Sequence, residues 1–274
     1  MVIDVSDEEL AALTQGILAR YGIDFTCYEP QSLKRRIIKL LHTCNFTAIH
    51  QLWLKLLSDT TFIKTVMNEV SVGMTSMFRD PFFWVHLKHL LEREFRNKPT
   101  ISIWHAGCST GEEVHSMGIV LHEADLAAKS RSLATDFNRD AIEVARKGEY
   151  HKIKMIENER NYAEYNRFQL LSHYTKPIDG KHLQMLPDLT RHVTYQYHNL
   201  VSDPFPETFD IIFCRNVMIY FDNPTKEKLL QKFYRSLNPG GYFIIGFYDV
   251  MHALTDERRF SLINEPAKIF QKRM

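Results

Sequence analysis

The chain has 274 residues, 45% of them hydrophobic and 24% charged, an ordinary composition for one large globular domain or for a large and a small one. Its formal net charge of +1 excludes a strongly basic nucleic-acid footprint over the whole chain. No apolar run reaches the roughly eighteen residues of a membrane-spanning helix. The N-terminus lacks a signal-peptide pattern, and the four cysteines form no CxxC pair. We therefore expect a soluble, cytoplasmic protein.

Residues 1–70 predict an all-helical domain. Ser6 is placed to cap a first helix that starts at Asp7, with acidic residues in its first turn. A second helix, basic on one side, is expected from Ser32. Two more are expected at 51–57 and 61–70.

Residues 71–98 predict a linker followed by one helix. Pro81 suits the first turn of that helix, which is expected to run to about Phe95.

Residues 99–274 predict an α/β domain with a doubly wound, parallel sheet, because strands alternate with helices. Strands are expected at 101–106, 131–136, 193–198, 210–215 and 241–247, and helices at 112–124, 139–147 and 224–237. Two closing strands are expected between Phe260 and Lys272.

One region breaks this alternation. Between Tyr150 and Arg191 the chain is polar and aromatic, with a turn signal from Pro177 to Gly180. It is too long for a plain connection. We interpret it as a small inserted β-subdomain at about 155–192, containing a hairpin.

The loop after the first strand has a glycine turn and an acidic pair. Gly107 and Gly111 flank this turn, and Glu112 and Glu113 open the next helix. Neither the G-x-G-x-x-G fingerprint nor a P-loop is present, and the two carboxylates would repel a pyrophosphate. They suit a positively charged ligand such as S-adenosylmethionine, or they simply complement the helix dipole.

The second and fourth strands also end in polar residues. Asp136 ends the second strand, where an acidic side chain commonly binds ribose hydroxyls; it can alternatively cap the next helix, a role that Asn138 can fill instead. Arg215, Asn216 and Tyr220 follow the fourth strand, in the zone where open α/β sheets bind ligands. Together these residues indicate that the ligand is a nucleoside, because no phosphate-binding motif accompanies them.

The chain resembles the chemotaxis-receptor glutamate methyltransferases, the CheR family, over nearly its whole length. The resemblance rests on the Gly111–Glu113 loop, the strand end at Asp136, residues 198–200 and residues 214–222. It implies a Rossmann-like methyltransferase domain that uses S-adenosylmethionine and releases S-adenosylhomocysteine. Its implied cofactor-binding residues are Thr75, Arg79, Gly107, Glu113, Asp136, Asn199, Leu200, Arg215, Asn216 and Tyr220.

The resemblance also implies roles for some of these residues. Glu113 meets the methionine amino group, Asp136 meets the ribose, and Asn199 with Leu200 borders the adenine. Arg79 and Tyr220 lie nearest the transferred methyl group and are the candidate catalytic residues. No metal is needed, because a glutamate acceptor is already ionised at pH 7.

Three positions depart from the family pattern: Gly73 replaces an Asn, Val114–His115 a Pro-Tyr pair, and Phe247–Asp249 a His-Ser-Glu run. The change at Gly73 affects an expected cofactor contact, and the other two changes leave the acceptor open. One alternative is a related methyltransferase for another acceptor, and another is a cofactor-binding signalling module with little turnover and a partner other than a chemoreceptor. Retention of both Arg79 and Tyr220 speaks against the module.

Two further features bear on partners. Lys34, Arg35, Arg36 and Lys39 form a basic cluster that either lies on a solvated helix face or, as the family implies, contacts the acidic cytoplasmic helices of chemoreceptors. Nucleic acid is not expected there, since the cluster is short. The aromatic residues of the insertion either form a docking surface or pack the insertion onto the sheet; they are Tyr162, Tyr165, Phe168 and Tyr174.

Overall fold

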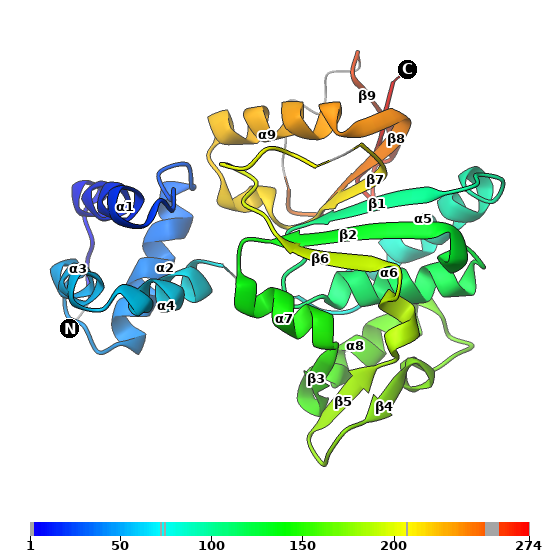
Figure 1. Ribbon diagram of the computed structural model, residues 1–274, viewed down its shortest axis with the longest axis horizontal. Helices are drawn as coiled ribbons and strands as arrows, with labels where there is room; N and C mark the ends of the chain where they lie inside the picture. Colours follow the sequence, from blue (N-terminus) through cyan, green and yellow to red (C-terminus); the bar gives the residue numbers. More distant parts are fainter. Residues whose placement is uncertain (1–2, 72, 74, 207, 250–257, 274) are drawn as a thin grey trace. The chain divides into compact units, whose positions relative to one another are not determined.

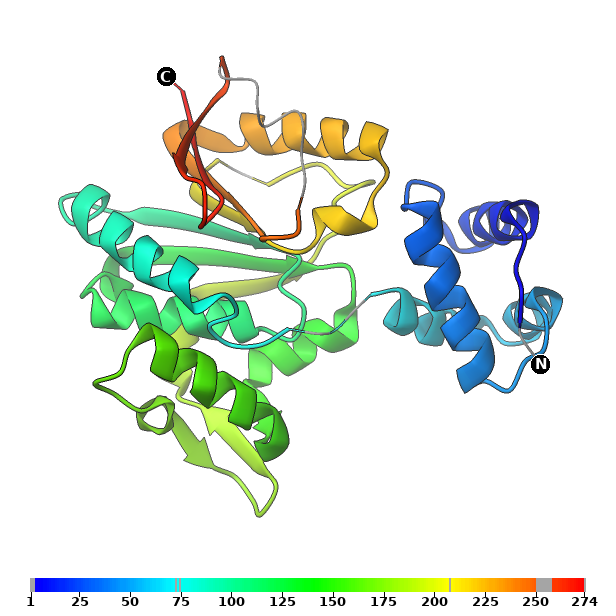
Figure 2. The ribbon, with the colours of Figure 1, turned by 180° about the vertical axis from the view of Figure 1, so that it is seen from behind.

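The computed structural model describes residues 3–71, 73, 75–206, 208–249 and 258–273 (Figure 1). Packing divides the chain into two units, which Figures 1 and 2 show from opposite sides. The first comprises Met1–Gly73 and Met218–Leu229, and the second comprises Met74–Val217 and Leu230–Met274. None of the helices in the described part of the chain combines the length and apolar character of a bilayer span.

The first unit is helical, as predicted. Its helices are α1 (Asp7–Tyr21), α2 (Pro30–Thr43), α3 (Ile49–Ser58), the 3-10 turn η1 (Thr60–Phe62) and α4 (Ile63–Val70). The predicted cap of α1 is confirmed as a capping box, in which Ser6 and Glu9 each accept a backbone N–H from the other. The predicted start of α2 at Ser32 is wrong by two residues, because Pro30 opens the helix and Glu29 caps it.

A segment from late in the sequence packs with these helices. It contains the 3-10 turn η5 (Met218–Tyr220) and the first turns of α9 (Asn223–Arg235). Tyr28 and Phe221 form an isolated antiparallel β-bridge, and their rings meet edge to face at 5.3 Å. The first unit is therefore built from two stretches that lie about 145 residues apart in the sequence.

The second unit is built on a seven-stranded sheet, counted over the described residues, in the order β6-β2-β1-β7-β8-β10-β9. The first five strands pair in parallel and the last two are antiparallel. This confirms the predicted doubly wound sheet with two closing strands. The strands are β1 (Ile101–Ala106), β2 (Ser130–Asp136), β6 (Val193–Tyr197), β7 (Phe209–Cys214), β8 (Leu237–Ile245), β9 (Phe260–Asn264) and β10 (Ile269–Lys272).

Helices cover both faces of the sheet (Figures 1 and 2). Successive side chains of a strand point to opposite faces. Ile103 and Phe213 pack into a core with α5 (Pro81–Glu94) and α6 (Glu112–Glu123). Trp104 and Phe243 turn the other way, against Phe233 of α9. Helix α7 (Arg139–Lys147) packs against β2 and β6. The strands are thus buried on both faces, which is why their sequences are apolar runs.

The inserted region contains the predicted hairpin but also a helix that the sequence did not predict. Strands β4 (Thr175–Pro177) and β5 (His182–Met185) flank the predicted turn, and β3 (Glu149–His151) completes a three-stranded sheet. The predicted β-subdomain is present, and the unpredicted helix α8 (Lys152–Tyr165) precedes its hairpin. This helix buries few residues, and two of them are asparagines, so its apolar periodicity is weak.

Glu123 at the end of α6 holds the insertion in place. Its carboxylate is 5% exposed and accepts hydrogen bonds from the hydroxyls of Tyr162 (2.8 Å), Tyr165 (2.7 Å) and Tyr174 (3.3 Å). Lys88 of α5 lies 3.4 Å from the same carboxylate. Three of the four insertion aromatics therefore pack inward, and only the fourth, Phe168, is left exposed (93%).

The ionised state of Glu123 follows from these contacts. Burial alone raises its pKa, but the hydrogen bonds from Tyr165 and Tyr162 and the charge of Lys88 outweigh burial, so its pKa lies below the ordinary value. A carboxyl with a lowered pKa stabilises the fold above its unfolded-state pKa, and that contribution is lost as the pH falls through the folded-state pKa.

Replacing Glu123 with Ala is expected to lower the free energy of unfolding by roughly 2–4 kcal/mol, because three hydroxyls and one ammonium lose a shared partner. The measurement is urea denaturation at pH 7, followed by circular dichroism. Glu164→Ala on the exposed side of α8 serves as the control and is expected to change little. Equal midpoints for the two variants would contradict the role of Glu123.

Candidate active site

The candidate site lies at the carboxyl edge of the sheet, beside β1 and β7. The strand order reverses between these two strands, since β1 continues to β2 on one side and β7 to β8 on the other. Such a switch point opens a crevice for ligands at the strand ends. The residues predicted from the ends of β1, β2 and β7 therefore converge on one edge.

The loop after β1 needs glycine at two positions. Gly107 and Gly111 have φ angles of +86° and +90°, in the left-handed region. A Cβ on Gly107 would lie 2.5 Å from Val217, and one on Gly111 would lie 2.7 Å from Ala145. The loop is also tied to β2, because the N–H groups of Gly107 and Cys108 both donate to the carbonyl of Thr135 at 2.8 Å.

The acidic pair at the start of α6 splits into two roles. Glu112 is fully buried and accepts a hydrogen bond from the Thr110 hydroxyl at 2.6 Å, and burial raises the pKa of its carboxyl. Glu113 remains 17% exposed and reaches the strand ends, where its Oε1 lies 2.9 Å from His105 Nδ1. Of the two, only Glu113 is placed to meet a ligand at the sheet edge.

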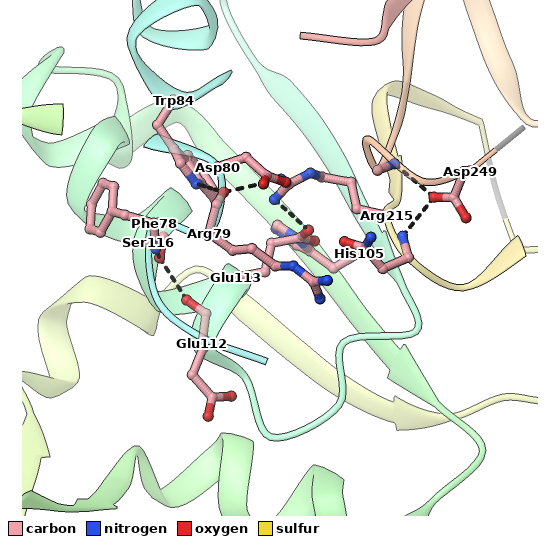
Figure 3. Close-up of polar contacts among 12 residues, drawn as sticks. Phe78, Arg79, Asp80, Trp84, His105, Glu112, Glu113, Ser116, Arg215 and Asp249 are labelled. Carbon is pink, nitrogen blue, oxygen red and sulfur yellow. Dashed lines mark hydrogen bonds and ion pairs between the residues drawn. The ribbon is translucent and has the colours of Figure 1, made fainter. Parts of the chain in front are cut away.

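Arg215 lies at the centre of the polar contacts in this edge (Figure 3). Its side chain is 4% exposed, and its guanidinium lies over the ring of Phe83 at 4.3 Å. One terminal nitrogen lies 3.5 Å from Glu113, and the other donates to Asp80 at 2.7 Å. A buried cation needs such partners to offset its desolvation, so Arg215 fixes two acidic side chains from separate segments.

Arg79 lies between two residues that have an uncommon backbone conformation. Phe78 before it and Asp80 after it have φ angles of +51° and +58°, a left-handed conformation that costs about 1–2 kcal/mol per non-glycine residue. The Arg79 carbonyl accepts hydrogen bonds from Trp84 Nε1 and from Arg215, both at 3.1 Å. These contacts hold the turn in one conformation (Figure 3).

Two further contacts anchor this turn within the second unit. The N–H of Phe78 donates to Ser116 Oγ at 2.9 Å, and that hydroxyl donates to the carbonyl of Glu112 at 2.7 Å. The N–H of Met77 donates to Asn158 of α8 at 2.9 Å. Thr75, which precedes the turn, is partly buried.

Asp136 joins the glycine loop to the segment after β6. Its Oδ2 accepts the N–H of Ser109 at 2.8 Å, and its Oδ1 accepts the N–H of Asn138 at 2.9 Å. Burial raises the pKa of its carboxyl despite these two hydrogen bonds. Its carbonyl accepts the N–H of His198, which brings Asn199 and the buried Leu200 next to the end of β2. The alternative role of Asp136 as helix cap is not used, because Asn138 caps α7.

Asp249 braces the loop after β7, which sequence reasoning did not foresee. Its Oδ2 accepts the N–H groups of Asn216 (2.6 Å) and Gly246 (2.7 Å). Asn216 has a φ of +58°, and a Cβ on Gly246 would lie 2.6 Å from its side chain. Of the divergent residues there, Asp249 is therefore structural, whereas Phe247 and Tyr248 are 59% and 68% exposed.

Tyr220 belongs to the first unit by its packing. Its carbonyl accepts the N–H of Glu29 at 2.8 Å, and the Arg36 guanidinium lies 5.4 Å from the centre of its ring. The nearness of Tyr220 to Arg79 stays a prediction. The predicted basic cluster is divided in the same way: Arg36 contacts Tyr220, while Arg35 and Lys39 are exposed on α2.

Sequence reasoning singled out polar residues at strand ends and in the loops after them, and the family resemblance added Arg79. The structure brings together Arg79, Glu113 and Arg215 in one cluster, with Asp136 on the neighbouring strand. Asp80 was missed, although its place just before Pro81 marks it as an N-cap. Its side chain makes no cap and turns to Arg215 instead.

Comparison with known proteins gives matches along almost the whole chain. A family model described as the CheR methyltransferase all-alpha domain matches residues 8–71, and one described as the CheR methyltransferase SAM-binding domain matches residues 73–269. The chain is 30% identical over 267 residues to Cher3 of Pseudomonas putida, covering 97% of both chains. It is 27% identical to a chemotaxis protein methyltransferase of Listeria innocua, covering 90% of this chain and 91% of the relative. The corresponding protein of Escherichia coli is 28% identical, with coverages of 94% and 89%.

Replacing Asp136 with Ala is expected to weaken the binding of S-adenosylhomocysteine by about 1–3 kcal/mol, because ribose hydroxyls lose an acceptor. Calorimetric titration measures this affinity. Asp140→Ala on the exposed start of α7 is the control and is expected to bind normally. Unchanged affinity in a folded Asp136→Ala protein would count against the ribose assignment.

Proposed function

Because this chain belongs to the CheR methyltransferase family, we propose that it transfers methyl groups to glutamate side chains of chemoreceptors, the methyl-accepting chemotaxis proteins. Its cofactor is S-adenosylmethionine. The observation that carries the proposal is the match of both family domains, over residues 8–71 and 73–269. The names of the Listeria innocua and Escherichia coli relatives support an acceptor in the chemotaxis system.

The residues at the sheet edge fit this cofactor chemically. Glu113 offers a partly exposed carboxylate for the ammonium group. Asp136 uses one lone pair of each oxygen for a backbone N–H, and a carboxylate has about four such sites, so it can also accept from ribose hydroxyls. We assign the border of the adenine to Asn199 and Leu200.

The chemistry requires orientation and little acid–base assistance. When bound, S-adenosylmethionine supplies the methyl group, whose C–S bond breaks as an acceptor carboxylate oxygen forms the new C–O bond. The acceptor needs no proton removed, because a glutamate side chain, whose pKa is ordinarily about 4.3, is ionised at pH 7. The protein therefore has to hold the carboxylate in line and exclude water from it.

Arg79 is our candidate for orienting the acceptor carboxylate. Its guanidinium can grip a carboxylate through two hydrogen bonds. Its carbonyl is held by Arg215 and Trp84, so the side chain starts from a fixed backbone. Tyr220 is the second candidate and would direct the approach through its hydroxyl.

Incubation with labelled S-adenosylmethionine is expected to place base-labile label on receptor cytoplasmic domains, because carboxyl esters hydrolyse in base. Arg79→Ala is expected to lower kcat about 100-fold, since positioning is lost. Tyr220→Phe loses only a hydroxyl and is expected to lower it by about tenfold or less. Lys176→Gln on the exposed strand β4 controls for loss of a charge and should retain the wild-type kcat.

The pH dependence separates this mechanism from one with a general base. The rate is expected to stay flat from about pH 6 to 8, because the acceptor titrates well below this range. A steep rise through neutral pH, or base-stable label, would refute carboxylate methylation.

The first unit offers the surface that we assign to the receptor. On α2, Arg35 and Lys39 are exposed one turn apart, and Lys39 is held 2.6 Å from Glu69. Lys34 lies inward, 3.6 Å from Asp7, and is partly buried. We therefore propose Arg35 as the main residue of the receptor contact. Arg36 is not included in this surface, because it contacts Tyr220.

Arg35→Glu is expected to raise the KM for the receptor several-fold, while the affinity for S-adenosylhomocysteine stays unchanged. The difference from the wild type should shrink at high salt, because exposed charges are screened. Lys55→Glu on α3 is the matched control, since it changes the net charge equally on another helix. Equal KM values for Arg35→Glu and the wild type would remove α2 from the receptor surface.

A further inference from the structure

We propose that His105 is a positioning residue for Glu113, and that it makes the site prefer ligands bearing a free amino-acid end over nucleosides that lack one. The inference rests on the proposed function, under which Glu113 binds the ammonium group of the cofactor. The proposed methyl transfer does not itself require a histidine, and the inference gives His105 a function beside that reaction.

The imidazole of His105 is fixed in place by its surroundings. His105 lies in β1, paired with Ala134 of β2 on one side and Phe213 of β7 on the other. Its ring is stacked on Phe213, with 4.7 Å between ring centres and 12° between ring planes, and the residue is 1% exposed. A ring held by a central strand and a stacked neighbour can direct a hydrogen bond with little loss of entropy.

The contact with Glu113 sets the tautomer of this histidine. Nδ1 of His105 lies 2.9 Å from Oε1 of Glu113, so Nδ1 carries the proton and donates to the carboxylate. Within the described residues, the buried Nε2 has no hydrogen-bond partner.

The second oxygen of Glu113 faces a different kind of group. Oε2 lies 3.5 Å from the guanidinium of Arg215, whose charge is shared with Asp80. The carboxylate is therefore oriented at close range by the imidazole N–H and more loosely by the guanidinium. These contacts fix the direction of the carboxylate and leave it 17% exposed, so Glu113 can still receive an ammonium group.

The same geometry separates His105 from the transfer step. The imidazole is buried at the side of Glu113 and makes its polar contact with that residue (Figure 3). It acts through Glu113 on the amino-acid end of the ligand. Its loss should consequently be felt by ligands that have this end and not by those without it.

Two substitutions of His105 distinguish the effect of its hydrogen-bond donor from the effect of its aromatic ring. His105→Phe keeps a stacked ring and removes the donor, whereas His105→Asn keeps a donor nitrogen near the place of Nδ1. The probes are S-adenosylhomocysteine and 5′-methylthioadenosine, which lacks the amino and carboxyl groups. Calorimetric titration of the full chain gives both dissociation constants for each variant.

His105→Phe is expected to weaken S-adenosylhomocysteine binding about tenfold, the worth of a lost hydrogen bond to a charged group, and to leave methylthioadenosine within about twofold. His105→Asn is expected to restore most of the difference. Equal losses for both ligands, or no loss for either, would overturn the inference.

Glu113→Gln distinguishes a failure of this inference from a failure of the proposed site. Selective loss of S-adenosylhomocysteine in Glu113→Gln but not in His105→Phe overturns the role of His105 and leaves the Glu113 assignment standing. If Glu113→Gln shows no selective loss, the ammonium assignment itself is wrong and the inference falls with it. Methyl transfer to receptor domains is measured separately, so the reaction is judged on its own.

Discussion

The site depends on one buried cation, the guanidinium of Arg215. It is nearly excluded from water, and its three partners come from two segments: Asp80 and the carbonyl of Arg79 from one turn, and Glu113 from α6. Burying a guanidinium costs several kcal/mol unless its donors are matched. The folded chain must therefore bring these partners together, and in doing so it fixes the groups that we assign to the cofactor and to the acceptor.

In the loops around that cation, several non-glycine residues have left-handed backbone conformations, which are unfavourable without support from their surroundings. Phe78, Asp80, Ser109 and Asn216 all have positive φ angles, and all lie in the loops at the carboxyl edge of the sheet. Three of them donate their backbone N–H to a side chain of another segment, and the carboxylate of the fourth, Asp80, accepts from Arg215. Strain of this kind persists only where the surroundings over-determine it, and it holds the loops ready for a ligand.

The sequence predicted the sheet and most helices because their signals are local. Apolar runs mark the buried strands, and Ser6 and Pro81 mark helix starts. It also located the site, since polar residues after buried strands converge at one edge; the individual roles came from the family resemblance. Helix α8 was missed because it is anchored by hydrogen bonds to Glu123 and not by an apolar stripe. The partnership of Asp80 with Arg215 spans 135 residues and leaves no local pattern.

The packing of residues 218–229 with the N-terminal helices has a consequence for modular exchange. A chain cut after residue 73 does not yield two complete modules, because the helical part loses the strand partner of Tyr28 and the other part carries an unmatched Phe221. Recombination at this boundary would pair the N-terminal helices of one protein with residues 218–229 of another, although the two surfaces evolved in different proteins. The helical module and residues 218–229 are therefore expected to be inherited together. When related proteins are compared, changes in receptor preference are expected to accompany changes in the residues around Tyr220.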